Sequence, residues 1–207
     1  MPYVWINPVT NSMYEPEVLD EFLRHHGYKR FYTSVDWLAI VKEKYRLVVS
    51  ASEHVVMDMR CPKVKELLVE MDMTTNVTVP DIKPILIHCG QEACGKEELQ
   101  GEEKIITTPC QALADMGNAL GLENTWFVPW NKFIEFIGSE LEVRILKKSP
   151  IPPGFFDELG LKTVSITGED EIRNYFKQDM SEEVQLVEIL YCKDGCHNGD
   201  GIKGCRE

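Results

Sequence analysis

Short apolar segments alternate with amphipathic segments along most of the chain, and this alternation constrains the fold most. Residues 3–6, 163–166 and 184–191 are typical of strands, whereas residues 62–71 and 111–120 repeat their apolar side chains with a helical period. Such an alternation favours an α/β fold in which mainly parallel sheets are flanked by helices. With 207 residues, the chain can form one sizeable core or two small lobes.

The preferred division is into two lobes. Polar residues 74–79, ahead of Pro80, suggest a boundary between an N-terminal lobe, residues 1–79, and a C-terminal lobe, residues 80–207. A single compact domain is the alternative. Residues 149–154 contain three prolines and form the clearest break in the chain, which predicts a hinge or a surface crossing.

Further elements follow from local patterns. Residues 34–45 predict a helix capped by Ser34, and residues 46–50 and 84–88 predict strands. Four aromatic side chains are expected in the core: Trp126, Trp130, Phe133 and Phe136.

The composition argues against several classes of partner. A formal net charge of −12 disfavours binding to nucleic acid and to anionic membrane surfaces, both of which attract basic patches. No apolar run approaches the ~18–20 residues that span a bilayer, and the N-terminal residues lack the pattern of a signal peptide. We therefore expect a cytoplasmic protein that binds neither nucleic acid nor a membrane.

Seven cysteines in such a protein indicate metal or redox chemistry, because disulfides are rare in a reducing compartment. Four of them lie in three short motifs near the carboxyl ends of predicted strands: Cys61, Cys110, Cys192 and Cys196. Iron–sulfur clusters usually take four cysteine thiolates as ligands, so convergence of the three motifs would create a cluster site. Burial as small apolar side chains is the alternative.

Cys61 and Cys110 each follow a predicted strand and precede a predicted helix. Pro62 suits the first position of its helix because its missing N–H group costs nothing there, which makes Cys61 the N-cap. Unpaired N–H groups and the positive end of the helix dipole stabilise a thiolate. We therefore expect lowered pKa values for both thiols.

Cys192 and Cys196 are separated by three residues, in a loop that contains Gly195, Gly199 and Gly201. Glycine permits positive φ angles and close backbone approach, which lets N–H groups donate hydrogen bonds to cluster sulfides. Zinc sites also use cysteines two to four residues apart, so the spacing alone leaves a zinc site open.

Residues 187–201 resemble the last motif of the C-terminal, cluster-binding (H-cluster) domain of the iron-only (FeFe) hydrogenase large subunit. That family motif has two cysteines three residues apart, followed by a segment rich in Asn and Gly. Cys61-Pro62 resembles the family's first motif, and Pro109-Cys110 its second. The resemblance implies that the four cysteines hold a 4Fe–4S cubane, which in the family is bridged by the last cysteine to a di-iron subsite with CO and CN ligands.

The chain is a shortened and divergent version of that pattern. Arg60 stands where the family usually has a second cysteine that transfers protons, and Leu113 stands where a lysine contacts a cyanide ligand. Met116 replaces an acidic residue. The resemblance therefore implies that the cubane ligands are kept, whereas the groups that serve a di-iron subsite are not, and no di-iron subsite is expected.

These observations predict a 4Fe–4S cluster between the two lobes that serves electron transfer or redox sensing, with a redox partner protein in an anaerobic organism and without independent hydrogen turnover. A divergent catalytic hydrogenase subunit and a zinc-stabilised interaction module are the alternatives. Four residues of the last motif are expected to line the cofactor: Gly195, Asn198, Gly199 and Gly201.

The remaining cysteines carry weaker expectations. Cys89 and Cys94, beside His88, could form a second metal site with Cys205 or a redox dithiol, but the pattern favours Cys89 at the end of a buried strand and Cys94 packed in a helix. His197 is either a hydrogen-bond donor behind the metal ligands or an exposed loop residue.

Overall fold

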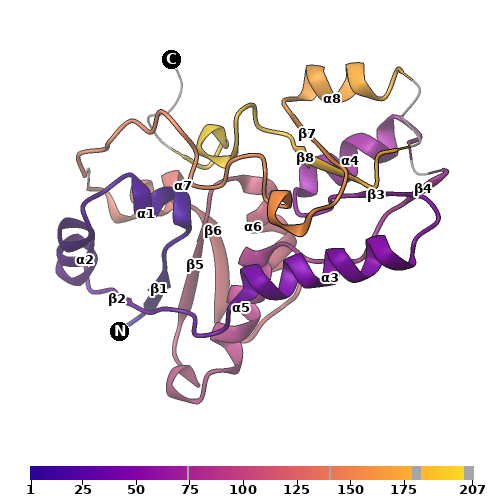
Figure 1. Ribbon diagram of the computed structural model, residues 1–207. Coiled ribbons are helices and arrows are strands. Elements are labelled where there is room, and N and C mark those ends of the chain that lie inside the picture. The colour runs from indigo at the N-terminus through magenta and orange to yellow at the C-terminus, as the bar shows by residue number, and fades with distance from the viewer. Residues whose placement is uncertain (74, 140, 179–182, 203–207) are drawn as a thin grey trace. The chain divides into compact units, whose positions relative to one another are not determined.

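The computed structural model describes residues 1–73, 75–139, 141–178 and 183–202 (Figure 1). Cys205 lies outside this part of the chain. The chain forms two compact units, each built from separate stretches of sequence. Unit 1 comprises Met1–Val35, Leu86–Pro150 and Cys196–Glu207, and unit 2 comprises Asp36–Ile85 and Ile151–Gly195. The boundary expected after residue 79 divides the chain into consecutive lobes, whereas both units are discontinuous.

Unit 1 contains a four-stranded parallel sheet in the order β2-β1-β5-β6. Its strands are β1 (Tyr3–Trp5), β2 (Lys29–Arg30), β5 (Lys104–Thr108) and β6 (Thr125–Pro129). Its helices are α1 (Pro8–Ser12), α2 (Pro16–His25), α5 (Ile85–Gly95), α6 (Gln111–Asn118) and α7 (Trp130–Ile137), with 3₁₀ turns η1 (Glu97–Leu99) and η3 (Cys196–Asn198). The first residue of α5 is assigned to unit 2.

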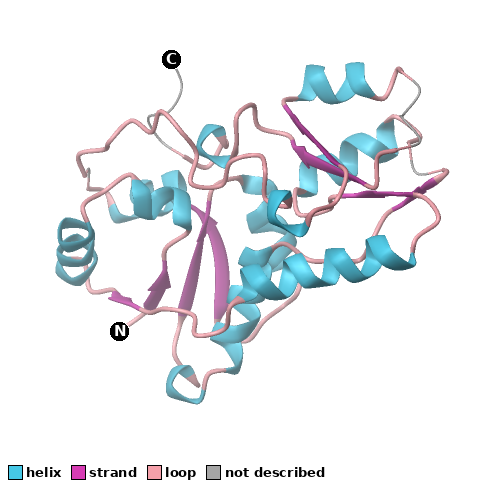
Figure 2. Ribbon diagram, viewed as in Figure 1, coloured by secondary structure: helices cyan, strands magenta, loops and turns pink. Residues whose placement is uncertain are grey.

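Unit 2 contains a second four-stranded parallel sheet, in the order β4-β3-β8-β7 (Figure 2). Its strands are β3 (Val55–Met57), β4 (Val77–Thr78), β7 (Thr163–Thr167) and β8 (Leu186–Leu190). Its helices are α3 (Trp37–Ala51), α4 (Pro62–Glu70) and α8 (Glu169–Tyr175), with the 3₁₀ turn η2 (Asp157–Leu159). Helices together with two parallel sheets confirm the predicted α/β fold with two lobes.

Phe127 of β6 sets the spacing between sheet and helices in unit 1. Its side chain is buried, and a Cβ atom added at Gly90 of α5 or at Gly117 of α6 would lie 2.2 Å from its ring. Both helices therefore approach this strand closely because glycine leaves room for the ring. Trp130 and Phe133 of α7 are also buried, and their rings pack against those of Tyr14 and Tyr28, respectively.

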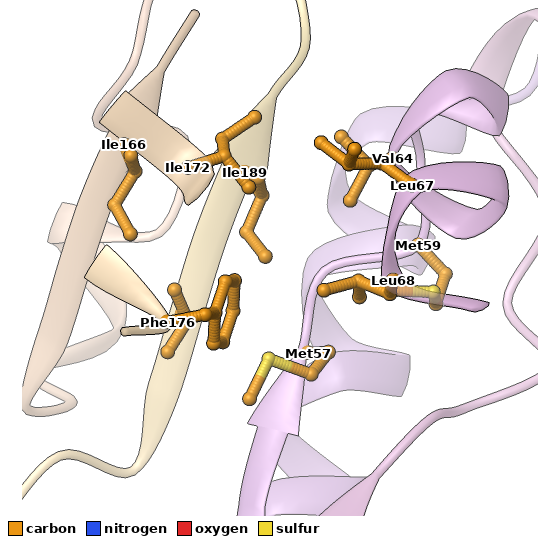
Figure 3. Close-up of a cluster of buried hydrophobic side chains, with 10 residues drawn as sticks. Met57, Met59, Val64, Leu67, Leu68, Ile166, Ile172, Phe176 and Ile189 are labelled. Atoms are coloured by element: carbon orange, nitrogen blue, oxygen red, sulfur yellow. The ribbon is translucent and has the colours of Figure 1, made fainter. Parts of the chain in front are cut away.

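Helices cover both faces of the sheet of unit 2. Neighbouring residues of a strand point to opposite faces, so one strand contributes side chains to both buried clusters. On β3, Val56 belongs to a buried cluster with Val41, Tyr45 and Val49 of α3. Met57 belongs to the opposite cluster, which joins the sheet to α4 and α8 (Figure 3). The members of the latter are Met57, Met59, Val64, Leu67, Leu68, Ile166, Ile172, Phe176, Val187 and Ile189.

Two predicted strands are wrong. Residues 46–50 continue α3, because Val41, Tyr45 and Val49 recur every four residues and are buried together. Of the predicted strand 84–88, residues 85–88 form the first turn of α5. The buried side chains of α5 lie on most of its circumference, so a continuous apolar run marks a buried helix here. The cap of α3 also differs: Asp36, rather than Ser34, accepts the N–H hydrogen bond of the first turn.

The aromatic prediction is correct for half of its residues. Trp130 and Phe133 are buried, whereas Trp126 and Phe136 are 45% and 82% exposed. Trp126 and Phe127 are neighbours on β6 and point to opposite faces, so only Phe127 meets α5 and α6. Among the described residues, no helix is both long and apolar enough to span a bilayer.

Candidate metal centre

Cys61 and Cys192, here called the unit 2 pair, follow the adjacent parallel strands β3 and β8. Cys61 is the N-cap of α4, as predicted, and has an extended backbone. Its thiol accepts hydrogen bonds from the backbone N–H groups of Tyr191, Val64 and Lys63. Because Tyr191 immediately precedes Cys192, the sulfur of Cys61 lies at the start of the loop that carries Cys192.

The acidity of Cys61 differs from the prediction. Burial raises the pKa of its thiol above the usual value, although the backbone N–H groups of Tyr191 and of the first turn of α4 act in the opposite direction. The cost of removing the thiolate from water exceeds the gain from the helix end. In the metal-free protein the neutral thiol is therefore favoured, and a metal ion bound here would displace its proton.

Cys110 and Cys196, here called the unit 1 pair, are brought together by a backbone contact between distant segments. Cys110 is buried, follows β5 and is the N-cap of α6, again as predicted. Cys196 begins the turn η3, and the segment after it lies on the backbone of Pro109. Gly201 donates its N–H to the Pro109 carbonyl at 3.0 Å, and the Cys196 carbonyl accepts the N–H of Gly199 at 3.1 Å.

Asp200 fixes this contact at the beginning of α6. Its carboxylate accepts the N–H of Gln111 at 2.9 Å, and its carbonyl accepts a hydrogen bond from the Asn131 side chain at 3.0 Å. Asn131 also donates its own N–H to the Gly201 carbonyl at 2.9 Å. A carboxylate at a helix N-terminus is stabilised by the helix dipole. Asp200 thus occupies one of the α6 N–H groups that the sequence assigned to the Cys110 thiolate.

The three glycines of the last motif provide room for close backbone contacts. Their N–H groups donate to protein carbonyls: Gly195 to Cys192, Gly199 to Cys196, and Gly201 to Pro109. Gly195 has a φ of 118°, which disfavours any other residue. A Cβ atom at Gly199 would lie 2.2 Å from the Pro109 carbonyl oxygen, and one at Gly201 would lie 2.9 Å from the Cys110 nitrogen. Asn198 lies in η3 and is half-buried.

Replacing Gly199 with alanine is expected to detach residues 196–202 from α6 and to destabilise the metal-free protein by about 1–3 kcal/mol. The added methyl group meets backbone atoms that cannot move aside as a side chain can. Chemical denaturation and hydrogen exchange of the C-terminal peptide measure both effects. Gly95→Ala is the matched control, since its Cβ meets nothing within 4 Å. Equal protection of the C-terminal peptide in both variants would contradict the expectation.

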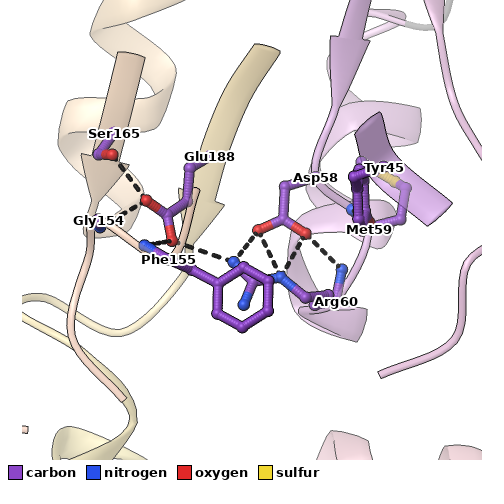
Figure 4. A network of polar contacts seen from close by, with 8 residues as sticks. All are labelled: Tyr45, Asp58, Met59, Arg60, Gly154, Phe155, Ser165 and Glu188. Carbon is purple, nitrogen blue, oxygen red and sulfur yellow. Dashed lines mark hydrogen bonds and ion pairs between the residues drawn. The ribbon is translucent and has the colours of Figure 1, made fainter. Parts of the chain in front are cut away.

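Arg60 directly precedes Cys61, and its side chain lies in a buried ionic network (Figure 4). The guanidinium donates to both oxygens of Asp58, at 2.7–3.1 Å, and to Glu188 at 3.0 Å. It also lies over the ring of Phe155, 3.7 Å from the centroid. Burial alone would lower the pKa of Arg60, but the two carboxylates raise it above its ordinary value. Arg60 is therefore a fixed cation.

Glu188 is the centre of this network. Its carboxylate accepts the backbone N–H groups of Gly154 and Phe155 at 2.6 and 3.0 Å, and the Ser165 hydroxyl at 2.6 Å. The proline-rich segment 149–154 is thus tied at its end to β8, the strand that leads to Cys192. The signal for this role in the sequence is a lone Glu in the middle of an otherwise apolar strand.

The cysteines outside the motifs lie in α5, so the prediction that Cys89 ends a strand is wrong. Burial raises the pKa of the Cys89 thiol to about 12, while a hydrogen bond with Thr33 acts in the opposite direction. The Cys94 thiol lies 3.8 Å from the Glu123 carbonyl, to which it donates. Such a Cys89 thiol has almost no thiolate at neutral pH, which favours packing over a redox dithiol. A site that includes Cys205 lies outside the described residues.

Each unit thus brings two of the four predicted ligands into one region. Among the described residues, however, no group of three or more His, Cys, Asp or Glu side chains is arranged as a metal site. His197, next to Cys196, is 6% exposed, so of the two alternatives for this residue the exposed loop residue is excluded. Leu113 is buried and Met116 half-buried. Two thiols from each unit match the donor chemistry of an iron–sulfur cluster, and of zinc.

Comparisons with models of protein families, with curated proteins and with solved structures find no match. The hydrogenase resemblance therefore rests on the three cysteine motifs alone. The positions of those motifs in the fold do not depend on that resemblance.

Proposed function

We propose that the chain binds one 4Fe–4S cluster through Cys61, Cys110, Cys192 and Cys196 and uses it for electron transfer or redox sensing with a partner protein. One observation carries this proposal: four cysteines spread over more than a hundred residues form two pairs, each positioned at the carboxyl end of a parallel sheet. Ligand sites in α/β proteins commonly lie at such strand ends.

In this proposal the four cysteine ligands come from two kinds of position, helix N-caps and one loop. Cys61 and Cys110, as N-caps, present their sulfurs from the ends of β3 and β5. Cys192 and Cys196 come from one loop, and only three residues separate them, although they are assigned to different units. A bound cubane supplies a site that accepts or releases one electron.

Burial determines the protonation state of Cys61 that a metal ion would meet. The raised pKa favours the neutral thiol in the metal-free protein, so binding of iron at Cys61 would have to release that proton. The backbone N–H groups of Tyr191 and Val64 then donate to a sulfur that carries charge, which strengthens both hydrogen bonds.

Metal analysis after anaerobic reconstitution with iron and sulfide tests the proposal. We expect about four iron and four sulfide per chain, together with broad absorption near about 400 nm. Stoichiometric zinc, without iron or sulfide and without colour, would instead favour the zinc-stabilised interaction module, which uses the same thiols.

Hydrogen turnover is not expected, even after anaerobic maturation. The Arg60 guanidinium remains protonated because Asp58 and Glu188 hold it, so it cannot relay protons. Leu113 is buried and apolar and cannot donate a hydrogen bond to a cyanide ligand. Gas chromatography and proton–deuterium exchange should give background values. Hydrogen evolution with infrared bands of iron-bound CO and CN would identify a divergent catalytic hydrogenase subunit instead.

A further inference from the structure

His197 has a buried polar atom that no described residue contacts through a hydrogen bond. The side chain lies in the turn η3, directly after Cys196, and is 6% exposed. Its Nδ1 atom makes no hydrogen bond within the described part of the chain. Buried polar side-chain atoms are nearly always paired in native proteins, so an unpaired one calls for a partner that the described residues do not supply.

The backbone around His197 is held on its C-terminal side. Gly199 donates to the Cys196 carbonyl, Ile202 donates to the Gly199 carbonyl, and Gly201 donates to the Pro109 carbonyl. These hydrogen bonds hold the segment that carries His197 against the backbone of Pro109, beside Cys110. His197 therefore belongs to the segment that holds Cys196 beside Cys110, the unit 1 pair.

We propose that His197 donates a hydrogen bond from Nδ1–H to a sulfur atom of the cluster or of its cysteine ligands. This inference rests on the proposed function, because the acceptor is part of the bound cluster. Sulfur atoms of a cubane become more negative on reduction, so an N–H donor stabilises the reduced state and raises the reduction potential. A neutral imidazole with its proton on Nδ1 is sufficient.

Asparagine and leucine variants of His197 separate the hydrogen bond from the volume of the side chain. The side-chain amide of asparagine places an N–H donor close to the position of Nδ1, whereas leucine fills space without a donor. The reduction potential is measured by reductive titration, followed by electron paramagnetic resonance, for three reconstituted full-length proteins: wild type, His197→Asn and His197→Leu. We expect a lower potential for His197→Leu and a value near wild type for His197→Asn. His54→Leu, at an exposed position of unit 2, serves as the control and should leave the potential unchanged.

The outcomes distinguish this inference from the proposed function. Equal potentials in wild type and His197→Leu, with full iron content in both, would overturn the inference alone. Absence of iron and sulfide from wild type would overturn the proposed function and this inference with it. If His197→Leu loses its iron, His197→Gln is measured in its place, because the side-chain amide of glutamine places its donor near the position of Nε2. A reduction potential that is lowered in His197→Gln but not in His197→Asn supports the inference. Equal potentials in these two variants overturn it.

Discussion

Replacing Cys192 or Cys196 with serine is expected to remove nearly all iron from the reconstituted protein while both sheets stay folded. In the proposed cluster site each residue would supply one of four thiolates, and a hydroxyl is a poor ligand for iron in a cubane. The two units have their own buried cores, which contain neither residue. Iron analysis and far-ultraviolet circular dichroism measure the two parts of this expectation.

Cys94→Ser is the matched control, because Cys94 is half-buried and lies outside the three motifs. It should retain full iron content. The iron-loaded wild type should also melt at a higher temperature than either ligand variant, since part of its folding free energy is metal binding. Ligand variants with wild-type iron content and wild-type melting would exclude these residues as ligands.

Replacing Arg60 with methionine is expected to destabilise unit 2 by about 3–5 kcal/mol. Methionine fills a similar volume but leaves the buried carboxylates of Asp58 and Glu188 without their cation. Glu188 also holds the backbone N–H groups of Gly154 and Phe155, so the end of the proline-rich segment should loosen at the same time. Hydrogen exchange of peptides from β3 and β8 in the metal-free protein reports the local loss of stability.

Arg46→Met provides the control for this variant. Arg46 also forms an ion pair, with Glu43, but both side chains are about half exposed, and such pairs contribute little in water. Its hydrogen exchange should match that of wild type. If Arg60→Met and Arg46→Met left the exchange of β3 and β8 equally unchanged, the network around Arg60 would have no structural weight.

Local sequence signals were sufficient where one residue decides the geometry. Pro62 after Cys61 predicted the start of α4. They were insufficient for residues 46–50 and 84–88. In the former, Val48 and Val49 have strand propensity, but Val49 extends a helical stripe that began at Val41. The tertiary core, rather than propensity, decides this segment.

The candidate site shows the same limit. The motifs placed Cys61 and Cys110 at helix starts correctly, because each depends on adjacent residues. The Asp200 contact to Gln111 joins positions 89 residues apart, and the Arg60 contact to Glu188 joins positions 128 residues apart. Such contacts follow only from the folded arrangement of the strands, so the sequence left Asp200 and Glu188 unassigned. The raised pKa of Cys61 could not be predicted from the sequence for the same reason, since the thiol is buried by residues distant in sequence.

The electron paramagnetic resonance spectrum of the reduced, anaerobically reconstituted wild-type protein tests the central claim most directly. The single cubane that we propose, with Cys61, Cys110, Cys192 and Cys196 as its ligands, would take up one electron and become paramagnetic. We predict one signal that integrates to about one spin per chain and disappears in the Cys61→Ser and Cys110→Ser variants alike. A signal that survives in either variant, or its absence from a wild type that binds zinc instead, would contradict the account.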